Sequence, residues 1–160
     1  MRSEQEVNEA VDLYADMIKR ICMVYLKNVA DTEDIFQTVF LKYMTSSICF
    51  ESRAHEKAWM IKVTINACKD LLKSFFRSRI VSIEEIIETA EVDNTESTEV
   101  LHAVLELPKK YREAVYLHYY EGYSAVEIGT MLNRKVNTVY SDLARAREIL
   151  KAKLGDDELG

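Results

Sequence analysis

The amino-acid sequence predicts an all-α protein in which an acidic linker joins two small helical domains. Only four of its 160 residues are Gly and one is Pro, so the chain offers little turn chemistry. Leu, Ala, Glu, Lys, Met and Ile, which favour helices, are plentiful instead. A hydrophobic content of 48% with 30% charged residues is typical of a globular protein that buries a core.

Three amphipathic helices predict a first domain over residues 1–79. The first helix places Val7, Val11, Tyr14, Ile18, Ile21 and Tyr25 on one face, at alternating steps of four and three. The second starts after VADTED, with Asp31 as its N-cap and Asp34 in its first turn, and runs through IFQTVFLKYM. TSSICFES follows as a loop, and HEKAWMIKVTINACKDLLKSFF returns to the helical period.

Residues 80–99 are predicted to be the linker, because SIEEIIETAEVDNTESTE has no basic residue and no sustained apolar face beyond one short helix over 83–87. The second domain covers 100–154, and 155–160 form an acidic tail. A short helix carrying Leu101, Val104 and Leu105 comes first. The next helix has Pro108 near its start and Gly122 just past its end, the usual asymmetry of helix termini.

The end of the second domain has the pattern of a helix-turn-helix. Ser124 and Glu127 form a capping box, and the helix they begin stops near Asn133, a residue that tolerates the left-handed conformation. Gly129 is a small residue where two helices must approach closely. From Lys135 a longer helix places Val136, Val139, Leu143, Ala146 and Leu150 on one stripe, with polar residues opposite.

Charge is distributed unevenly along the chain, although the formal net charge is -6. Residues 51–79 carry seven Lys and Arg against three Asp and Glu, and residues 108–154 carry nine against five. Residues 80–107 carry eight acidic residues and no Lys or Arg. Because the local field governs approach to phosphate, an acidic chain can still bear two surfaces for nucleic acid.

Catalysis, metal binding and membrane insertion are not expected. No nucleophile, base and orienting group cluster, and His55, His102 and His118 are isolated in the sequence. The cysteines, Cys22, Cys49 and Cys68, form no C-x-x-C motif and have no His at ligand spacing, so we expect them reduced and buried, without metal or cofactor. The chain has neither a membrane-spanning apolar run nor a signal peptide, which predicts a cytoplasmic protein.

The polar side of the last helix is a candidate surface for reading the DNA major groove. Arg145 can bond guanine bidentately, and Ser141 and Asn137 can donate or accept. Ala144 is small enough to meet a thymine methyl group. Asp142, at the margin of this face, either pairs with Arg145 at i, i+3 or accepts a hydrogen bond from a cytosine amino group.

A second candidate surface is a polar stripe on the third helix. It consists of Lys62, Asn66, Lys69 and Lys73, opposite the apolar residues Ile61, Ile65, Cys68 and Leu72. Lysines around one amide suit a helix lying on a phosphate backbone, although an ordinary solvated face has the same pattern. Phe50 and Trp59 flank the stripe and either stack on unpaired bases or belong to the core.

With these residues in view, the chain resembles sigma factors of bacterial RNA polymerase, of the sigma-70 family and its extracytoplasmic-function (ECF) group, which keeps only regions 2 and 4. DTEDIFQTVFLKYM is similar to region 2.2, and AWMIKVTINACKDLLKS is similar to regions 2.3 and 2.4. LPKKYREAVYLHYYEGYSAVEIGTML followed by NTVYSDLARAREILKAKL is similar to region 4. The likeness covers nearly the full chain, with the fragments in order.

The resemblance implies a non-enzymatic transcription initiation factor that binds core RNA polymerase, recognises the -35 and -10 promoter elements and aids promoter melting. It assigns Asp34, Gln37 and Thr38 to docking on the clamp of the largest subunit, with Thr38 standing where Glu is frequent. The loop over 46–53 matches the element that captures a flipped base. The -10 element is assigned to Lys62, Asn66, Lys69 and Lys73.

The resemblance also assigns the -35 element to six residues of the last helix. They are Asn137, Thr138, Tyr140, Ser141, Ala144 and Arg145. Tyr140 and Asp142 stand where Lys or Arg is frequent, and Asn133 and Asn137 replace common glycines. Further implied partners are the flap of the polymerase beta subunit and an anti-sigma factor. The acidic linker would run toward the RNA exit path, or would simply aid solubility.

Two other functions remain open at this stage. The second domain alone could serve a stand-alone helix-turn-helix regulator, which would leave DTEDIFQ and the lysine stripe unexplained. Alternatively, the chain could be a helical interaction module that never touches DNA, with both basic faces solvated. DNA binding without core polymerase would favour the first, and insensitivity of transcription to charge reversal would favour the second.

Overall fold

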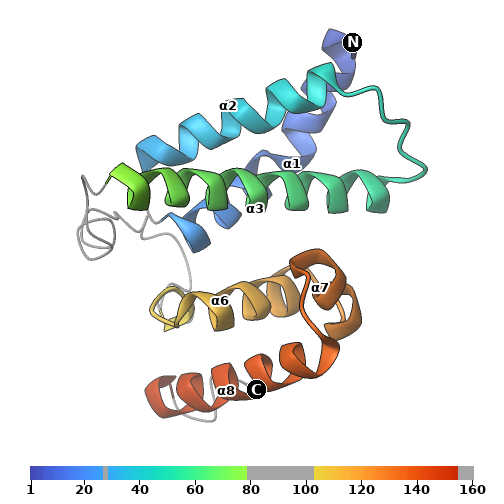
Figure 1. Ribbon diagram of the computed structural model, residues 1–160. Helices are drawn as coiled ribbons and strands as arrows, with labels where there is room; N and C mark the ends of the chain where they lie inside the picture. The colour runs from blue at the N-terminus through green and yellow to red at the C-terminus, as the bar shows by residue number, and fades with distance from the viewer. Residues whose placement is uncertain (27–28, 79–102, 155–160) are drawn as a thin grey trace. The chain divides into compact units, whose positions relative to one another are not determined.

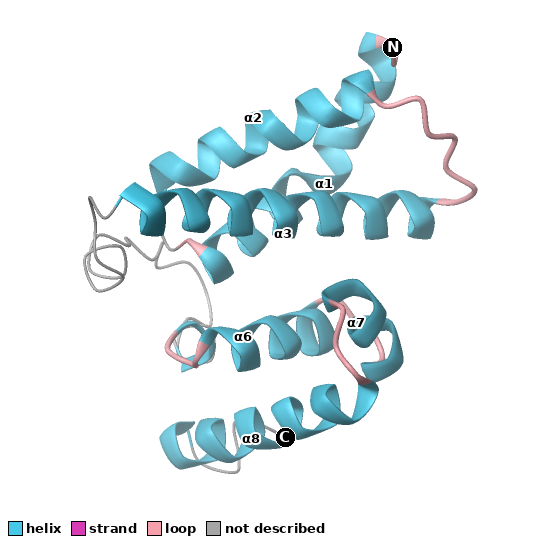
Figure 2. Cartoon of the chain, viewed as in Figure 1, coloured by secondary structure: helices cyan, strands magenta, loops and turns pink. Residues whose placement is uncertain are grey.

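The computed structural model describes residues 1–26, 29–78 and 103–154. The predicted linker, its helix over 83–87, Leu101, His102 and the acidic tail therefore lie outside the described residues. Every described segment is helix, turn or loop (Figure 2), which confirms the all-α prediction. The chain divides into two compact units, Met1–Glu91 and Val92–Gly160, and each is considered by itself.

Three helices that pack against one another form the first unit (Figure 1): α1 (Glu4–Tyr25), α2 (Val29–Thr45) and α3 (Arg53–Ser78). Helix α1 begins where the Ser3 side chain accepts a hydrogen bond from the Glu6 amide. Helix α2 begins at Val29, so the prediction of Asp31 as its N-cap is wrong and Asp31 lies in the first turn. The predicted loop before α3 is confirmed.

The predicted apolar faces of α1 and α3 meet in the core of this unit. Tyr14, Ile18, Ile21 and Tyr25 are buried from α1, and Ile61, Ile65 and Cys68 from α3, whereas Val7, Val11 and Leu72 are half-buried at the margins. Each fully buried large side chain contributes about 1.5–3 kcal/mol to folding. Cys22 and Cys68 are buried with their Sγ atoms 4.0 Å apart. Cys49 is exposed, so the prediction of its burial is wrong.

A buried carboxylate, Glu56, joins all three helices of the first unit. Its oxygens accept hydrogen bonds from the hydroxyl of Tyr14 at 2.8 Å and of Tyr43 at 3.0 Å. Arg53 Nη1 donates a third at 2.9 Å. Glu56 is only 6% exposed, so without these donors its charge would be costly to bury.

The same contacts shift the pKa values of the groups involved. Burial alone would raise the pKa of Glu56, but the hydrogen bonds from Tyr14, Tyr43 and Arg53 outweigh it and lower the pKa. Burial, together with the hydrogen bond to Glu56, raises the pKa of Tyr14 and of Tyr43 to about 12. These contacts therefore keep the phenols of Tyr14 and Tyr43 protonated and the carboxylate of Glu56 ionised at neutral pH.

The second unit contains α6 (Lys109–Val115), a π-helical turn η1 (Tyr116–Tyr120), α7 (Ala125–Leu132) and α8 (Val136–Leu154), after a short helical turn over 103–105. As predicted, Pro108 stands at the start of α6, and Gly122, with a φ of 78°, follows the end of η1. The π turn, which the sequence did not indicate, closes with a bond from the Glu121 amide to the Tyr116 carbonyl at 3.3 Å.

Helix α7 and the turn that follows it confirm three predictions. Ser124 and Glu127 form both hydrogen bonds of the capping box. Asn133 ends α7 in the left-handed conformation, with φ 56° and ψ 51°. A Cβ added to Gly129 would lie 2.8 Å from the carbonyl oxygen of Arg134, so only glycine lets the turn fold back this closely onto α7.

Arg134, in this turn, bridges two buried carboxylates on different helices. Its guanidinium lies 3.2 Å from Glu113 of α6 and 3.2 Å from Asp142 of α8, whose side chains are 3% and 7% exposed. It also donates to the carbonyl of Lys110 at 2.9 Å. Both interpretations of Asp142 are therefore wrong, since its carboxylate is buried against Arg134 and faces neither Arg145 nor solvent.

Glu56 makes the stability of the first unit depend on pH. Because its pKa in the folded state lies below the ordinary value of 4.5, its contribution is complete above that value and is lost as the pH falls through the folded pKa. Glu56→Gln should destabilise the protein by about 1–3 kcal/mol at pH 7 and flatten the acid limb of a stability profile from urea unfolding. Glu51→Gln, at an exposed position, is the control. A stability profile for Glu56→Gln that runs parallel to the wild-type profile would contradict the assignment of this pH dependence to Glu56.

Arg134→Met should destabilise the second unit by about 3–5 kcal/mol, because Glu113 and Asp142 then keep buried charge without the guanidinium that balances it. Adding Asp142→Leu should recover part of this loss, which a double-mutant cycle on urea unfolding would measure. Arg145→Met, at an exposed position of α8, should stay within about 0.5 kcal/mol of the wild type. Equal losses for the two single Arg variants would argue against the bridge.

Candidate nucleic-acid interface

The outer face of α8 is formed by the six residues predicted to meet DNA. Asn137, Thr138, Tyr140, Ser141, Ala144 and Arg145 are all exposed. On the opposite side, Val139 is buried, and Ala146 and Leu150 pack in a cluster with Val104, Leu107 and Val115. The core thus fixes the rotation of α8 about its axis, and this leaves a continuous polar face toward solvent.

Arg145 is the strongest hydrogen-bond donor on this face. Its side chain is 71% exposed, and it approaches Glu148 at 3.9 Å, where Glu148 is 73% exposed. An exposed pair of this kind contributes about 0–1 kcal/mol, so a base can displace the carboxylate at little cost. The guanidinium is therefore available for bidentate binding.

An open groove beside the outer face of α8 was missed by the sequence reasoning. Its lining comes from η1, the start of α7 and α8, and includes His118, Tyr119, Ser124, Tyr140, Arg147 and Lys151. Tyr140, Ala144, Arg147 and Lys151 follow one another at steps of four, three and four, a helical spacing that could have revealed this edge.

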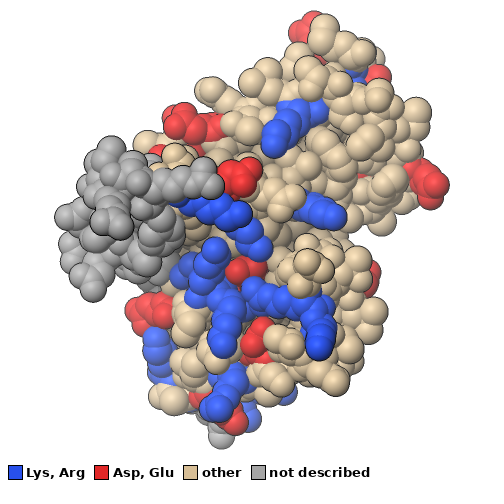
Figure 3. Space-filling view, viewed as in Figure 1, with Lys and Arg blue, Asp and Glu red and all other residues tan. Residues whose placement is uncertain are grey.

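Hydrogen bonds hold two of the basic groups in this groove. Arg147 Nη2 donates to the Tyr119 hydroxyl at 2.7 Å. His118 Nδ1 lies 2.8 Å from the carbonyl of Tyr123, and since a carbonyl only accepts, Nδ1 carries the proton. Lys and Arg side chains gather on the visible surface of this unit, with a few carboxylates among them (Figure 3). The groove therefore combines positive charge with fixed donors.

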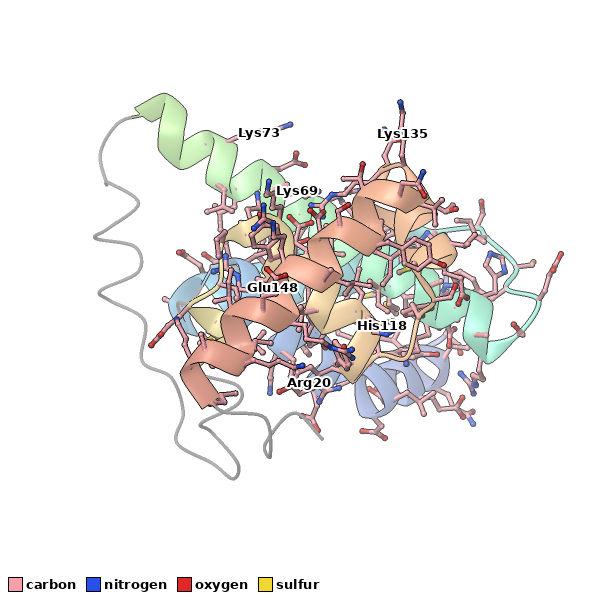
Figure 4. The ribbon with its side chains drawn as sticks, turned by 90° about the horizontal axis from the view of Figure 1, so that it is seen from below. Arg20, Lys69, Lys73, His118, Lys135 and Glu148 are labelled. Atoms are coloured by element: carbon pink, nitrogen blue, oxygen red, sulfur yellow. The ribbon has the colours of Figure 1, made fainter. Side chains whose placement is uncertain are left out.

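The predicted polar stripe of the first unit lies along one side of α3. Lys62, Asn66 and Lys73 are exposed and Lys69 is half-buried. Lys69 and Lys73 project from successive turns, and Lys73 extends away from the helix (Figure 4). The stripe is thus a continuous surface of one amide among three cations.

Phe50 and Trp59 belong to an aromatic cluster beside this stripe. The Phe50 ring lies 5.6 Å from Trp59 and 6.3 Å from Tyr43, measured between centroids. Both Phe50 and Trp59 are half-buried and Tyr43 is buried, so the packing supports the core interpretation of these rings. The loop over 46–52 that carries Phe50 leaves Ser47, Ile48 and Cys49 exposed.

The residues assigned to polymerase docking lie on the outer side of α2. Asp34 and Gln37 are exposed, and Thr38 is half-buried, with its hydroxyl donating to the Asp34 carbonyl at 3.0 Å. Leu41, which sequence reasoning did not single out, continues this side and is 60% exposed. One face of α2 presents Asp34, then Gln37 and Thr38, and then Leu41, at steps of three or four residues. A single partner surface can therefore contact them all.

No helix within residues 1–26, 29–78 and 103–154 is long and apolar enough to span a membrane. In the same part of the chain, no three His, Cys, Asp or Glu side chains come together as ligands for a metal ion.

Comparison with protein families matches both units. The family model described as "Sigma-70 region 2" matches residues 10–78, which include most of α1 and all of α2 and α3. The model described as "Sigma-70, region 4" matches residues 97–150, which include the helix-turn-helix. The two matches stand in the order that the resemblance implied and leave only short segments of the chain uncovered.

Two relatives are similar over most of the chain. The ECF RNA polymerase sigma factor SigW of Bacillus subtilis is 29% identical over 165 residues, covering 92% of this chain and 88% of that protein. RNA polymerase sigma factor SigV of the same organism is 26% identical over 142 residues, covering 88% of this chain and 86% of that protein.

Solved structures support the fold. The sigma factor RpoE, in its complex with the anti-sigma factor NepR from Bartonella quintana, matches with a TM-score of 0.75 at 19% identity, covering 96% of this chain and 99% of that one. CnrH, in its complex with the cytosolic domain of CnrY, matches with a TM-score of 0.62 at 18% identity, covering 94% and 88%. With both regions matched in order, the chain belongs to the sigma-70 family of RNA polymerase sigma factors, in its extracytoplasmic-function group.

Proposed function

We propose that this chain binds core RNA polymerase and directs it to promoters by recognising a -35 and a -10 element. The observation that carries the proposal is the outer face of α8, where all six predicted base-reading residues are exposed while the opposite side of the helix is fixed in the core. A helix of this kind, following a capped helix and a tight turn, fits the major groove. The chain performs no catalysis of its own in this role.

At the -35 element, α8 would separate base reading from phosphate binding. Arg145, Ser141 and Asn137 present donors and acceptors to base edges, and Tyr140 and Ala144 offer contact surface between them. The neighbouring groove, with Arg147 and Lys151, suits the phosphate backbone, whose contacts position a protein without specifying sequence. Asp142 takes no part, because it is bound to Arg134 in the interior.

At the -10 element, α3 and the loop before it would act together. Lys62, Lys69 and Lys73 place positive charge along α3 for the phosphates, with Asn66 among them as the base-capable group. The loop over 46–52 stands next to the start of α3 and exposes its central residues, as a segment that receives an unstacked base must.

Polymerase docking would use the outer side of α2. Asp34, Gln37 and Thr38 supply polar contacts with the clamp of the largest subunit, and Leu41 adds an exposed apolar contact. We extend the proposal to the flap of the beta subunit as a second contact on the polymerase. The complex of RpoE with the anti-sigma factor NepR supports an anti-sigma factor as a further partner. In this role the chain itself acts in the cytoplasm, where RNA polymerase is.

Run-off transcription with core polymerase on a genomic promoter library tests this function and yields the promoter motif. We expect specific transcripts that need both the chain and the core enzyme. Tight, sequence-specific DNA binding by the chain alone would instead favour a stand-alone helix-turn-helix regulator. Unchanged transcription after charge reversal at Lys62, Lys69 and Arg145 would favour an interaction module that does not touch DNA.

Arg145→Ala and Arg147→Ala should have different effects on promoter binding by the holoenzyme. Arg145→Ala should cost about 1–3 kcal/mol against the correct base at one -35 position and relax specificity there. Arg147→Ala should weaken binding to all promoters alike and reduce the salt slope by about 1. Filter binding at several salt concentrations on single-base promoter variants measures both, and a uniform loss for Arg145→Ala would refute its assignment.

Asp34→Ala combined with Gln37→Ala should weaken association with core polymerase while the chain stays folded, because both side chains are exposed. Leu41→Ala should act in the same direction through lost apolar contact. Glu33→Ala removes a neighbouring exposed carboxylate and is the matched control. A pull-down with core polymerase, alongside circular dichroism, gives the result; equal weakening by Glu33→Ala would point to overall charge rather than to this surface.

A further inference from the structure

Arg2 is held against the C-terminal end of α2 by contacts of both its backbone and its side chain. Its amide donates to the carbonyl of Met44 at 3.0 Å, and its Nε donates to the carbonyl of Tyr43 at 3.0 Å. Its side chain is only 12% exposed.

The start of α1 brings Arg2 to this position. Ser3 is the N-cap of α1, and its extended backbone turns the preceding residue away from the helix axis. Glu6, one turn into α1, lies 3.4 Å from Arg2 Nη1. The carbonyls of Tyr43 and Met44 are among the last of α2, where the helix dipole favours a positive charge.

The same guanidinium reaches the loop over 46–52. Its Nη2 donates to the carbonyl of Ile48, and its Cζ lies 4.5 Å from the ring centroid of Tyr43 and 5.0 Å from that of Phe50. A planar guanidinium can donate along its edge and stack through its face at once, which an ammonium group cannot do. Arg2 therefore bonds the end of α2, the middle of the loop and the aromatic ring at the far end of the loop.

We propose that Arg2 is a positioning residue that holds the loop over 46–52 in the shape needed to receive an unstacked promoter base. The base-receiving role rests on the proposed function of the loop. The ordering of the loop by Arg2 does not depend on that function. The bonds to Tyr43 and Ile48 fix the first half of the loop, and the contact with Phe50 fixes the second. The side chains of Ser47, Ile48 and Cys49 stay exposed, because Arg2 bonds only the backbone carbonyl of Ile48.

The order of the loop can be measured without DNA through Cys49. Cys22 and Cys68 are fully buried, so a nitroxide reagent labels the exposed Cys49 in the folded protein. We expect Arg2→Ala to lose the immobilised component of the nitroxide spectrum, and Arg2→Lys to lose part of it. Lys42→Ala removes an exposed cation from the last turn of α2 and should leave the spectrum unchanged. An unchanged spectrum for Arg2→Ala would overturn the proposal.

The role in melting is tested with unlabelled holoenzyme and a promoter carrying 2-aminopurine in its -10 element. Arg2→Ala should bind core polymerase as the wild type does but form the melted complex on the order of tenfold less well, since a charge-assisted anchor is lost. The role would be refuted if Arg2→Ala melted the promoter as well as the wild type. It would also be refuted if Arg2→Ala lost core binding to the same extent as it lost the melted complex. A wild-type holoenzyme that melts no promoter would refute the proposed function instead, and the nitroxide spectra would still decide whether Arg2 orders the loop.

Discussion

Buried carboxylates control the geometry of both units, because a carboxylate taken out of water must be met by donors in fixed positions. In the first unit, Glu56 gathers donors from α1, α2 and α3. In the second, Arg134 meets Glu113 and Asp142 from two helices at once. Apolar burial supplies most of the driving force for folding, but it is not directional. The charged contacts are directional, so they select one arrangement of each set of helices.

This arrangement explains how an acidic chain can present surfaces for nucleic acid. The carboxylates at positions 56, 113 and 142 are buried and paired with Arg53 or Arg134, so they contribute less to the field at the outer faces than exposed carboxylates would. The faces that remain outside carry Lys62 and Lys73 of α3 and Arg145, Arg147 and Lys151 of α8, all of which are exposed. Solvent-facing charges dominate the electrostatic field at the protein surface. The sign of a side chain's charge is therefore a poor guide to its effect on a partner until the burial of that side chain is known.

Structural features set by neighbouring residues were predictable from the sequence, whereas contacts between residues far apart in the sequence were not. The capping box at Ser124, the left-handed Asn133 and the close approach at Gly129 depend on a few neighbouring residues, and all three were predicted correctly. Asp142 was misread because its partner, Arg134, lies eight positions away across a turn, so helical spacing could not reveal it. The contacts of Arg2 with Tyr43 and Ile48 span more than forty residues, and no pattern of composition or periodicity records them.

The position of Arg134 in the turn also limits how this protein could be redesigned. Exchanging α8 for the corresponding helix of another sigma factor is an obvious route to a new promoter preference, since the residues proposed to read bases all lie on it. The guanidinium, however, sits outside α8 and is matched to a carboxylate inside it. A transplanted helix with a cation at position 142 would meet Arg134 as a like charge in the interior. The exchangeable module is therefore the turn together with the helix, and promoter specificity cannot be moved one element at a time.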